Sequence, residues 1–107
     1  MNELIFTVEI KAKEGFDEIV APFAQAMHKL SHEFDEGIIQ YDLYRSKDDR
    51  SMFYFVEEWE SEKALESHRQ KDHYKRFIEF LDGSAESIDK KFEKIDTTNL
   101  EKYEEMI

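Results

Sequence analysis

Four residues between positions 57 and 73 are candidates for a catalytic site, and three of them, Glu57, His68 and His73, have side chains that can do acid–base chemistry. Glu57 and Trp59 close an aromatic stretch, and His68 and His73 follow shortly after it. A carboxylate among apolar residues costs free energy unless it is paired, hydrogen-bonded or protonated. Glu57 is therefore either a base or proton acceptor with a raised pKa, or the partner of a structural group such as Arg45. The two imidazoles could converge on a substrate, one abstracting a proton and the other holding an oxyanion.

Structural roles for the same residues also fit the sequence. Trp59 could fill the core, and His68 could be a hydrogen-bonded core residue rather than a catalyst. His68 and His73 do not have the i, i+4 spacing of a helical metal pair, so we expect no metal site. The glycines are isolated and form no loop for a dinucleotide or phosphate, so we also expect no cofactor.

A strand followed by a broken helix must position these residues. Residues 53–59 alternate, with Glu57 and Trp59 on the more apolar face, as a strand requires. Ser61 can cap a helix that places His68 on its buried side, and Asp72 can cap a second helical piece. A sheet face covered by this broken helix would enclose a pocket. Its other predicted wall residues are Phe53, Phe55, Tyr41, His32, Phe77 and Leu81.

The remaining elements follow from the spacing of apolar residues. Residues 3–13 alternate as a half-buried strand, and residues 16–34 repeat at helical spacing. Residues 39–45 form a second strand, whose short polar connection to residues 53–59 predicts an antiparallel hairpin. A last strand is expected at 86–95. The resulting order is that of an α+β, ferredoxin-like βαββαβ fold with a four-stranded antiparallel sheet.

One face of that sheet would remain uncovered by the helices. A second copy of the chain would bury this mixed apolar surface, so we expect a homodimer. The surface is made up of Ile5, Thr7, Tyr54 and Val56. Residues 1–97 form the predicted domain. Residues 98–107 form a C-terminal tail with helix-like spacing that is too short to be stable alone, so we expect it to pack on something, such as the partner subunit.

The composition of the 107-residue chain limits its partners. The net charge of -11 and the lack of a run of Lys and Arg argue against nucleic acid, and an anionic membrane surface would repel the chain. No segment reaches the ~20 apolar residues of a membrane span, and the first residues lead into a strand rather than a signal peptide. The chain has no cysteine, which fits a reducing compartment, so we expect a cytoplasmic location.

Four motifs follow one another along the chain. They are Gly37-x-Ile39-x-Tyr41-Asp42-Leu43-x-Arg45, Glu57-x-Trp59-x-Ser61, Ala64-Leu65-x-x-His68 and His73-Tyr74-x-x-Phe77. Together they resemble the antibiotic biosynthesis monooxygenase domain, and the resemblance covers residues 3–95. It implies a dimeric α+β barrel, in which two ferredoxin-like sheets pack together and each subunit keeps a pocket between its sheet and helices.

The reactions found in this family differ. They include cofactor-independent oxidation of anthrones and quinols, haem degradation, and isomerisation of a small phosphorylated sugar. Val8, His68 and Ile78 stand where the haem degraders have Asn, Trp and His, which argues against haem degradation. Phe55 stands where the anthrone-type enzymes have Asn. The quinol-oxidising and sugar-isomerising members resemble this sequence more closely, at His68 and His73.

Three functional hypotheses follow from the resemblance and the residues. The first is a cofactor-independent monooxygenase of a small aromatic or quinol-type substrate, which His68, His73 or Glu57 would deprotonate. The second is an isomerase of a small sugar or keto compound, and the third is a non-catalytic dimeric domain that binds a small ligand. A phosphate on the isomerase's substrate would need cationic partners. The candidates are Arg45, Arg69, Lys75 and Arg76.

Overall fold

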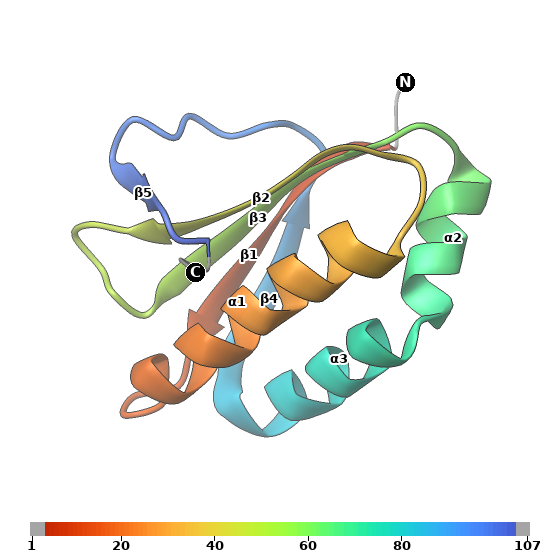
Figure 1. Ribbon diagram of the computed structural model, residues 1–107. Helices are drawn as coiled ribbons and strands as arrows, with labels where there is room; N and C mark the ends of the chain where they lie inside the picture. The colour runs from red at the N-terminus through yellow and green to blue at the C-terminus, as the bar shows by residue number, and fades with distance from the viewer. Residues whose placement is uncertain (1–3, 105–107) are drawn as a thin grey trace.

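The chain folds into an antiparallel sheet with its helices on one face (Figure 1). A computed structural model describes residues 4–104. The elements in chain order are β1 (Ile5–Ala12), α1 (Asp17–Phe34), β2 (Ile38–Ser46), β3 (Met52–Trp59), α2 (Glu62–Gln70), α3 (Asp72–Ser84), β4 (Ala85–Lys91) and β5 (Leu100–Lys102). This order confirms the predicted α+β ferredoxin-like fold. Among the described helices, none is long and apolar enough to cross a membrane.

Within residues 4–104 the sheet has five strands in the order β4-β1-β3-β2-β5, and the prediction of four was wrong. The first four strands pair as expected, with the predicted hairpin joining β2 to β3. The additional strand comes from the C-terminal tail, where Leu100 pairs with Ser46 and Lys102 with Tyr44 along the edge of β2. The spacing of apolar residues in the tail predicts a helix instead, because a three-residue strand is too short to show an alternating pattern.

The helical break lies where the sequence placed it, but the second cap differs. Ser61 caps α2, since its Oγ accepts a hydrogen bond from the backbone N–H of Ala64 at 3.0 Å. Asp72 was expected to cap α3, but the capping position is Lys71, whose extended backbone separates the two helices. The break turns α3 so that it packs beside α1 under the sheet (Figure 1).

The core lies between the inner face of the sheet and the helices. Its strand residues alternate along β1, β2 and β3, and α1 and α3 supply the opposite side. The largest buried apolar side chains are Phe6, Ile10, Val20, Met27, Tyr41, Leu43, Phe53, Phe55, Trp59, Leu65, Phe77 and Leu81. Trp59 is 1% exposed, so the indole is a core residue as well as a neighbour of the polar groups described below.

The outer face of the sheet is partly covered by the chain itself. Because β4 and β5 lie at opposite edges, residues 92–99 must run from one edge to the other (Figure 1). Thr7 and Val56, two of the four residues expected at a dimer interface, are buried, and the Thr7 hydroxyl donates to the carbonyl of Glu93 at 2.8 Å. The apolar surface available to a second subunit is therefore smaller than the sequence suggested.

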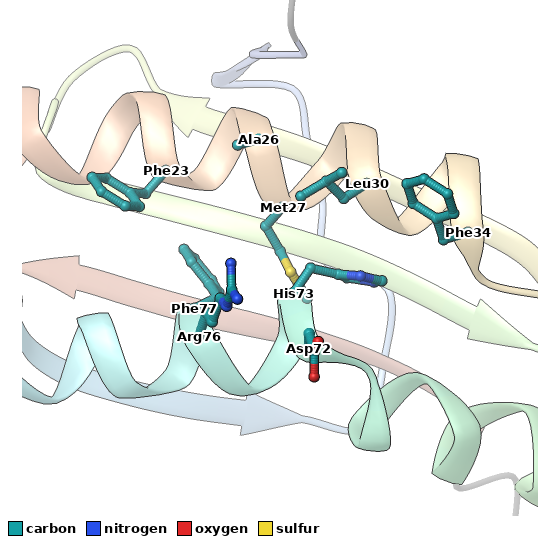
Figure 2. Close-up of a pocket in the computed structure, with 9 residues that line it drawn as sticks. All are labelled: Phe23, Ala26, Met27, Leu30, Phe34, Asp72, His73, Arg76 and Phe77. Carbon is teal, nitrogen blue, oxygen red and sulfur yellow. The ribbon is translucent and has the colours of Figure 1, made fainter.

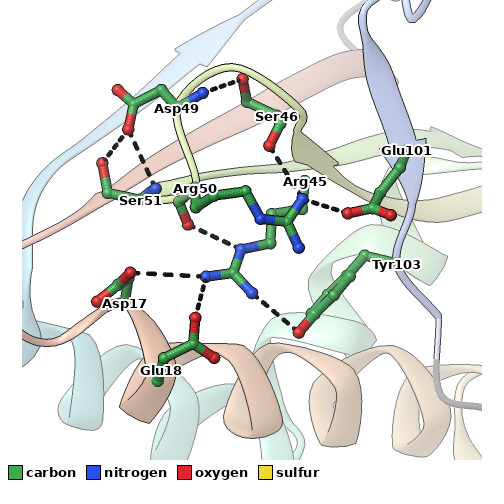
Figure 3. Close-up of polar contacts among 9 residues, drawn as sticks. All are labelled: Asp17, Glu18, Arg45, Ser46, Asp49, Arg50, Ser51, Glu101 and Tyr103. Carbon is green, nitrogen blue, oxygen red and sulfur yellow. Dashed lines mark hydrogen bonds and ion pairs between the residues drawn. The ribbon is translucent and has the colours of Figure 1, made fainter.

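Arg45 is fully engaged in a buried network at the end of β2 (Figure 3). Its guanidinium donates to the carbonyl of Arg50 at 2.7 Å, to the hydroxyl of Tyr103 at 2.9 Å and to the carboxylate of Glu18 at 2.9 Å. These contacts join the start of α1, the hairpin and the C-terminal segment. Arg45 is therefore neither the partner of Glu57 nor available to bind a phosphate.

Candidate functional site

A cavity of about 140 Å³ lies between the inner face of the sheet and the helices. Most of its wall is apolar, and Tyr41, Glu57, His68, Tyr74 and Lys90 supply the polar groups. The remaining lining residues are Val8, Ile10, Met27, Phe55, Phe77, Ile78, Leu81 and Ile88. A small apolar chamber with a few convergent polar groups is the usual form of a ligand site.

Glu57 is the buried carboxyl of this cavity. The indole Nε1–H of Trp59 donates to its Oε1 at 2.9 Å, and the side chain is almost entirely removed from solvent. Burial raises the pKa of Glu57 from 4.5 to about 8, and the hydrogen bond from Trp59 only partly opposes this rise. Glu57 is therefore a neutral acid at pH 7. It can donate a proton or a hydrogen bond, rather than act as the base that the sequence suggested.

His68 is the group in the cavity best placed to accept a proton. Its Nδ1 lies 2.7 Å from Oδ2 of Asp35, and both side chains are almost completely buried. Burial lowers the pKa of His68, although the Asp35 carboxylate partly counteracts it. A neutral imidazole whose Nδ1–H donates to a carboxylate leaves Nε2 as the free acceptor, which is the arrangement of a positioned general base.

Asp35 was missed by the sequence analysis, although it joins the two imidazoles. Its Oδ2 accepts from His68 and from Nε2 of His73, at 2.7 and 3.0 Å, and Nζ of Lys71 lies 3.6 Å from Oδ1. Burial alone would raise the pKa of Asp35, but the hydrogen bonds from His73 and His68 outweigh it and hold the pKa below its usual value. The available signal was topological. The turn before β2 must lie beside the turn after β3, because these strands are neighbours.

His73 does not reach the cavity and lies instead in a groove on the outside of the helical layer. Figure 2 shows the groove between α1 and α3, with the His73 ring between the two helices. The groove encloses about 450 Å³ and is open to solvent. It is lined by Phe23, Ala26, Met27, Leu30, Phe34, Asp72, His73, Arg76 and Phe77. His73 thus supports His68 through Asp35 from the side away from the cavity.

The other predicted pocket residues divide into two groups. Tyr41, Phe55, Phe77 and Leu81 line the cavity as expected. His32 and Phe53 do not. His32 donates to the backbone carbonyl of Tyr41 at 2.6 Å and so fastens α1 to β2, whereas Phe53 packs under the Arg45 guanidinium at 4.8 Å. Trp59 does not line the cavity but packs against His68, with a distance of 4.6 Å between the two ring centres.

Two clusters among residues 4–104 have donor atoms close enough to hold a metal ion. The first is Asp35 with His68 and His73, and the second is His28 with Asp42 and Glu104. The sequence spacing of His68 and His73 argues against the first cluster. That argument considers the two histidines alone and leaves out Asp35, which is distant from them in sequence. The distances of 2.7 and 3.0 Å within it are those of hydrogen bonds to Oδ2 of Asp35, whereas the other carboxylate oxygen, Oδ1, is buried without a hydrogen-bond partner.

Solved structures with the same fold come from several bacteria. PA3566 of Pseudomonas aeruginosa is 25% identical with a TM-score of 0.78, and the match covers 90% of this chain and 96% of that one. A conserved protein of unknown function from Bacteroides thetaiotaomicron is also 25% identical, with a TM-score of 0.72 and coverage of 84% and 97%. Rv0793 of Mycobacterium tuberculosis shares the fold at 19% identity and a TM-score of 0.74, with coverage of 88% and 96%.

The family comparison agrees with the fold and with the motifs of the strand and broken helix. No curated protein matches the chain. The family model described as antibiotic biosynthesis monooxygenase matches residues 4–79, which include β1 through most of α3 and carry Asp35, Glu57 and His68. The chain therefore belongs to the antibiotic biosynthesis monooxygenase family.

Proposed function

We propose that the protein is a cofactor-independent monooxygenase of a single-ring phenol or quinol. The observation that carries this proposal is a cavity in which a neutral acid, Glu57, and a carboxylate-supported base, His68, face the same apolar space. Its volume of about 140 Å³ matches the ~150 Å³ chamber that holds a benzene ring in an engineered protein. A fused three-ring anthrone is too large for it. The family name supports the reaction class.

The reaction would begin with proton transfer to Nε2 of His68. The Asp35 carboxylate stabilises the imidazolium that forms, and the apolar wall keeps water from the electron-rich ring. This ring reacts with O2, and the Glu57 carboxyl can donate a hydrogen bond to the reduced oxygen. One oxygen atom enters the ring and the other leaves as water, and the quinol supplies all the electrons. No external reductant is needed for this balance.

Oxygen uptake with single-ring quinols tests the proposal directly. We expect wild-type protein to consume O2 and to form the hydroxylated quinone, and His68→Gln to lose about 10²- to 10⁴-fold in rate, the usual contribution of a general base. His32→Gln is the matched control, because this histidine lies outside the cavity. Absence of uptake with every single-ring phenol and quinol, from protein shown to be folded, would overturn the proposal.

An isomerase of a small keto compound is the second candidate. The same observation favours it, because an acid and a base that face one cavity can move a proton between two carbons of a substrate. Its signature would be deuterium incorporation from solvent without oxygen consumption. We further propose that the protein is a homodimer with a cytoplasmic location. Sedimentation would measure the oligomer, for which Ile5 and Tyr54 remain half-buried on the outer face.

A further inference from the structure

A depression of about 400 Å³ adjoins the cavity where α2 faces β4. Lys90 lines both spaces, so the depression forms a rim beside the candidate site. The other cation of the rim is Arg69, which directly follows the buried His68 in α2. The complete lining is Leu4, Glu62, Leu65, Glu66, Arg69, Lys90 and Phe92.

The two cations of the rim have no ion-pair partner. Within residues 4–104, no carboxylate lies at salt-bridge distance from Arg69 or Lys90, although twelve such contacts occur elsewhere. The ammonium of Lys90 lies over the Phe6 ring at 4.6 Å instead. Glu66, which shares the rim, accepts a hydrogen bond from Gln70 at 2.8 Å.

The electrostatics of the rim favour an anion. Burial lowers the pKa of Lys90, and the charge of Arg69 lowers it further, so the two cations repel each other. Glu57, the carboxyl that lines the adjoining cavity, opposes this lowering of the Lys90 pKa only in part, and with its own pKa raised to about 8 it is mostly protonated at pH 7. The two cations therefore place positive charge beside the cavity of a chain whose net charge is -11, and the side chain of Arg69 is also hydrogen-bonded with that of Tyr74.

We propose that Arg69 and Lys90 form an anion subsite at the rim of the cavity, and that the substrate is a single-ring hydroxylated compound bearing a carboxylate or phosphate group. The ring would occupy the cavity and the anionic group would lie between the two cations. This inference rests on the proposed function for the place of the ring. Charge attraction at a partly exposed site also orients the ring, with its hydroxyl toward His68 and Glu57.

Binding of matched ligands tests the subsite. The ligands are 4-hydroxybenzoate, phenyl phosphate and the neutral 4-hydroxybenzyl alcohol, titrated by calorimetry and followed by the emission of Trp59. We expect one of the anions to bind at least about tenfold more tightly than the alcohol, and the preference to fall with salt. Lys90→Gln and Arg69→Gln should each remove most of this preference for the anion. Comparison of the two anions distinguishes carboxylate from phosphate.

Lys91→Gln is the matched control for the loss of a lysine from β4. Lys91 points to the other face of the sheet, where its ammonium pairs with Glu9 at 3.3 Å, so the preference should be unchanged. Equal affinity for all three ligands would overturn the subsite and leave the ring site intact. If no ring compound binds, the proposed function fails. Shifts of the Arg69 and Lys90 amide resonances with inorganic phosphate, absent in Lys90→Gln, would then still support the subsite, and no shift would overturn it.

Discussion

Replacement of Glu57 by Gln should make the protein's stability much less dependent on pH. In the folded protein the pKa of Glu57 is about 8, whereas in the unfolded chain it returns to its ordinary value of 4.5. Between these values the folded state holds one more proton than the unfolded state. The free energy of unfolding of the wild type therefore falls by about 1.4 kcal/mol for each pH unit, and by about 5 kcal/mol in total as pH rises to 8.

A neutral Gln cannot ionise, so Glu57→Gln should lose this component. Any cost of fitting the amide beside the Trp59 indole is the same at every pH and does not change the slope. Urea unfolding from pH 5 to pH 9 measures the effect. The free energy of unfolding of the variant should rise steadily relative to that of the wild type up to about pH 8. The single Trp59 provides a second reading, because ionisation of its hydrogen-bond partner should change its emission with the same midpoint.

Glu58→Gln is the matched control for this experiment. Glu58 is the next residue of β3, points to the outer face and pairs with Lys94 at 2.6 Å. Its replacement should leave the steep pH dependence of the wild type in place. Parallel stability curves for wild type and Glu57→Gln would refute the reasoning, since they would mean that Glu57 is already ionised in the folded state at neutral pH.

Four further substitutions test other parts of the structure. Asp35→Asn should lower the pKa of His68 further, measured by NMR titration of the imidazole, because the carboxylate now holds that pKa up; an unchanged titration would contradict the pairing. Gly37→Ala should destabilise the fold by more than about 2 kcal/mol in thermal or urea unfolding, since it adds a Cβ only 2.5 Å from a side-chain carbon to a residue with φ +82. Gly15→Ala, at φ +84 but with open space around it, should cost only about 1 kcal/mol, and equal losses would contradict the packing argument. Tyr103→Phe should cost about 1.5–3 kcal/mol by urea unfolding, because a buried guanidinium loses an acceptor, and a neutral result would mean that water replaces it.

The fold was predictable because its elements have distinct periods. The alternation of Phe53, Phe55 and Trp59 and the helical spacing around Phe77 each have one structural solution, and the capping serine marked where one gives way to the other. The fifth strand was not predictable. Its pairing depends on a free edge at β2, which is a property of the assembled sheet and not of residues 100–102 themselves.

Only those residues of the candidate site that line the cavity itself were predictable from the sequence. Glu57 and His68 were found because a charged or titratable residue on an apolar face is visible in the pattern. Asp35 was not found, because a carboxylate in a polar turn looks like any other exposed residue until strand order brings that turn beside α2. The same limit applied to Arg45 and Lys90, whose partners, or lack of them, depend on residues distant in sequence.

The path of residues 92–99 has a consequence for the order in which the chain folds. This segment contacts the Thr7 hydroxyl, which donates to the carbonyl of Glu93 and accepts from the backbone N–H of Ile95. Thr7 faces Val56 across β1 and β3, so we expect the segment to dock after those two strands have paired. It closes a long loop in sequence and gains its contacts late. The C-terminal segment therefore packs last, on a sheet that has already formed. Its removal should increase the unfolding rate far more than it decreases the folding rate.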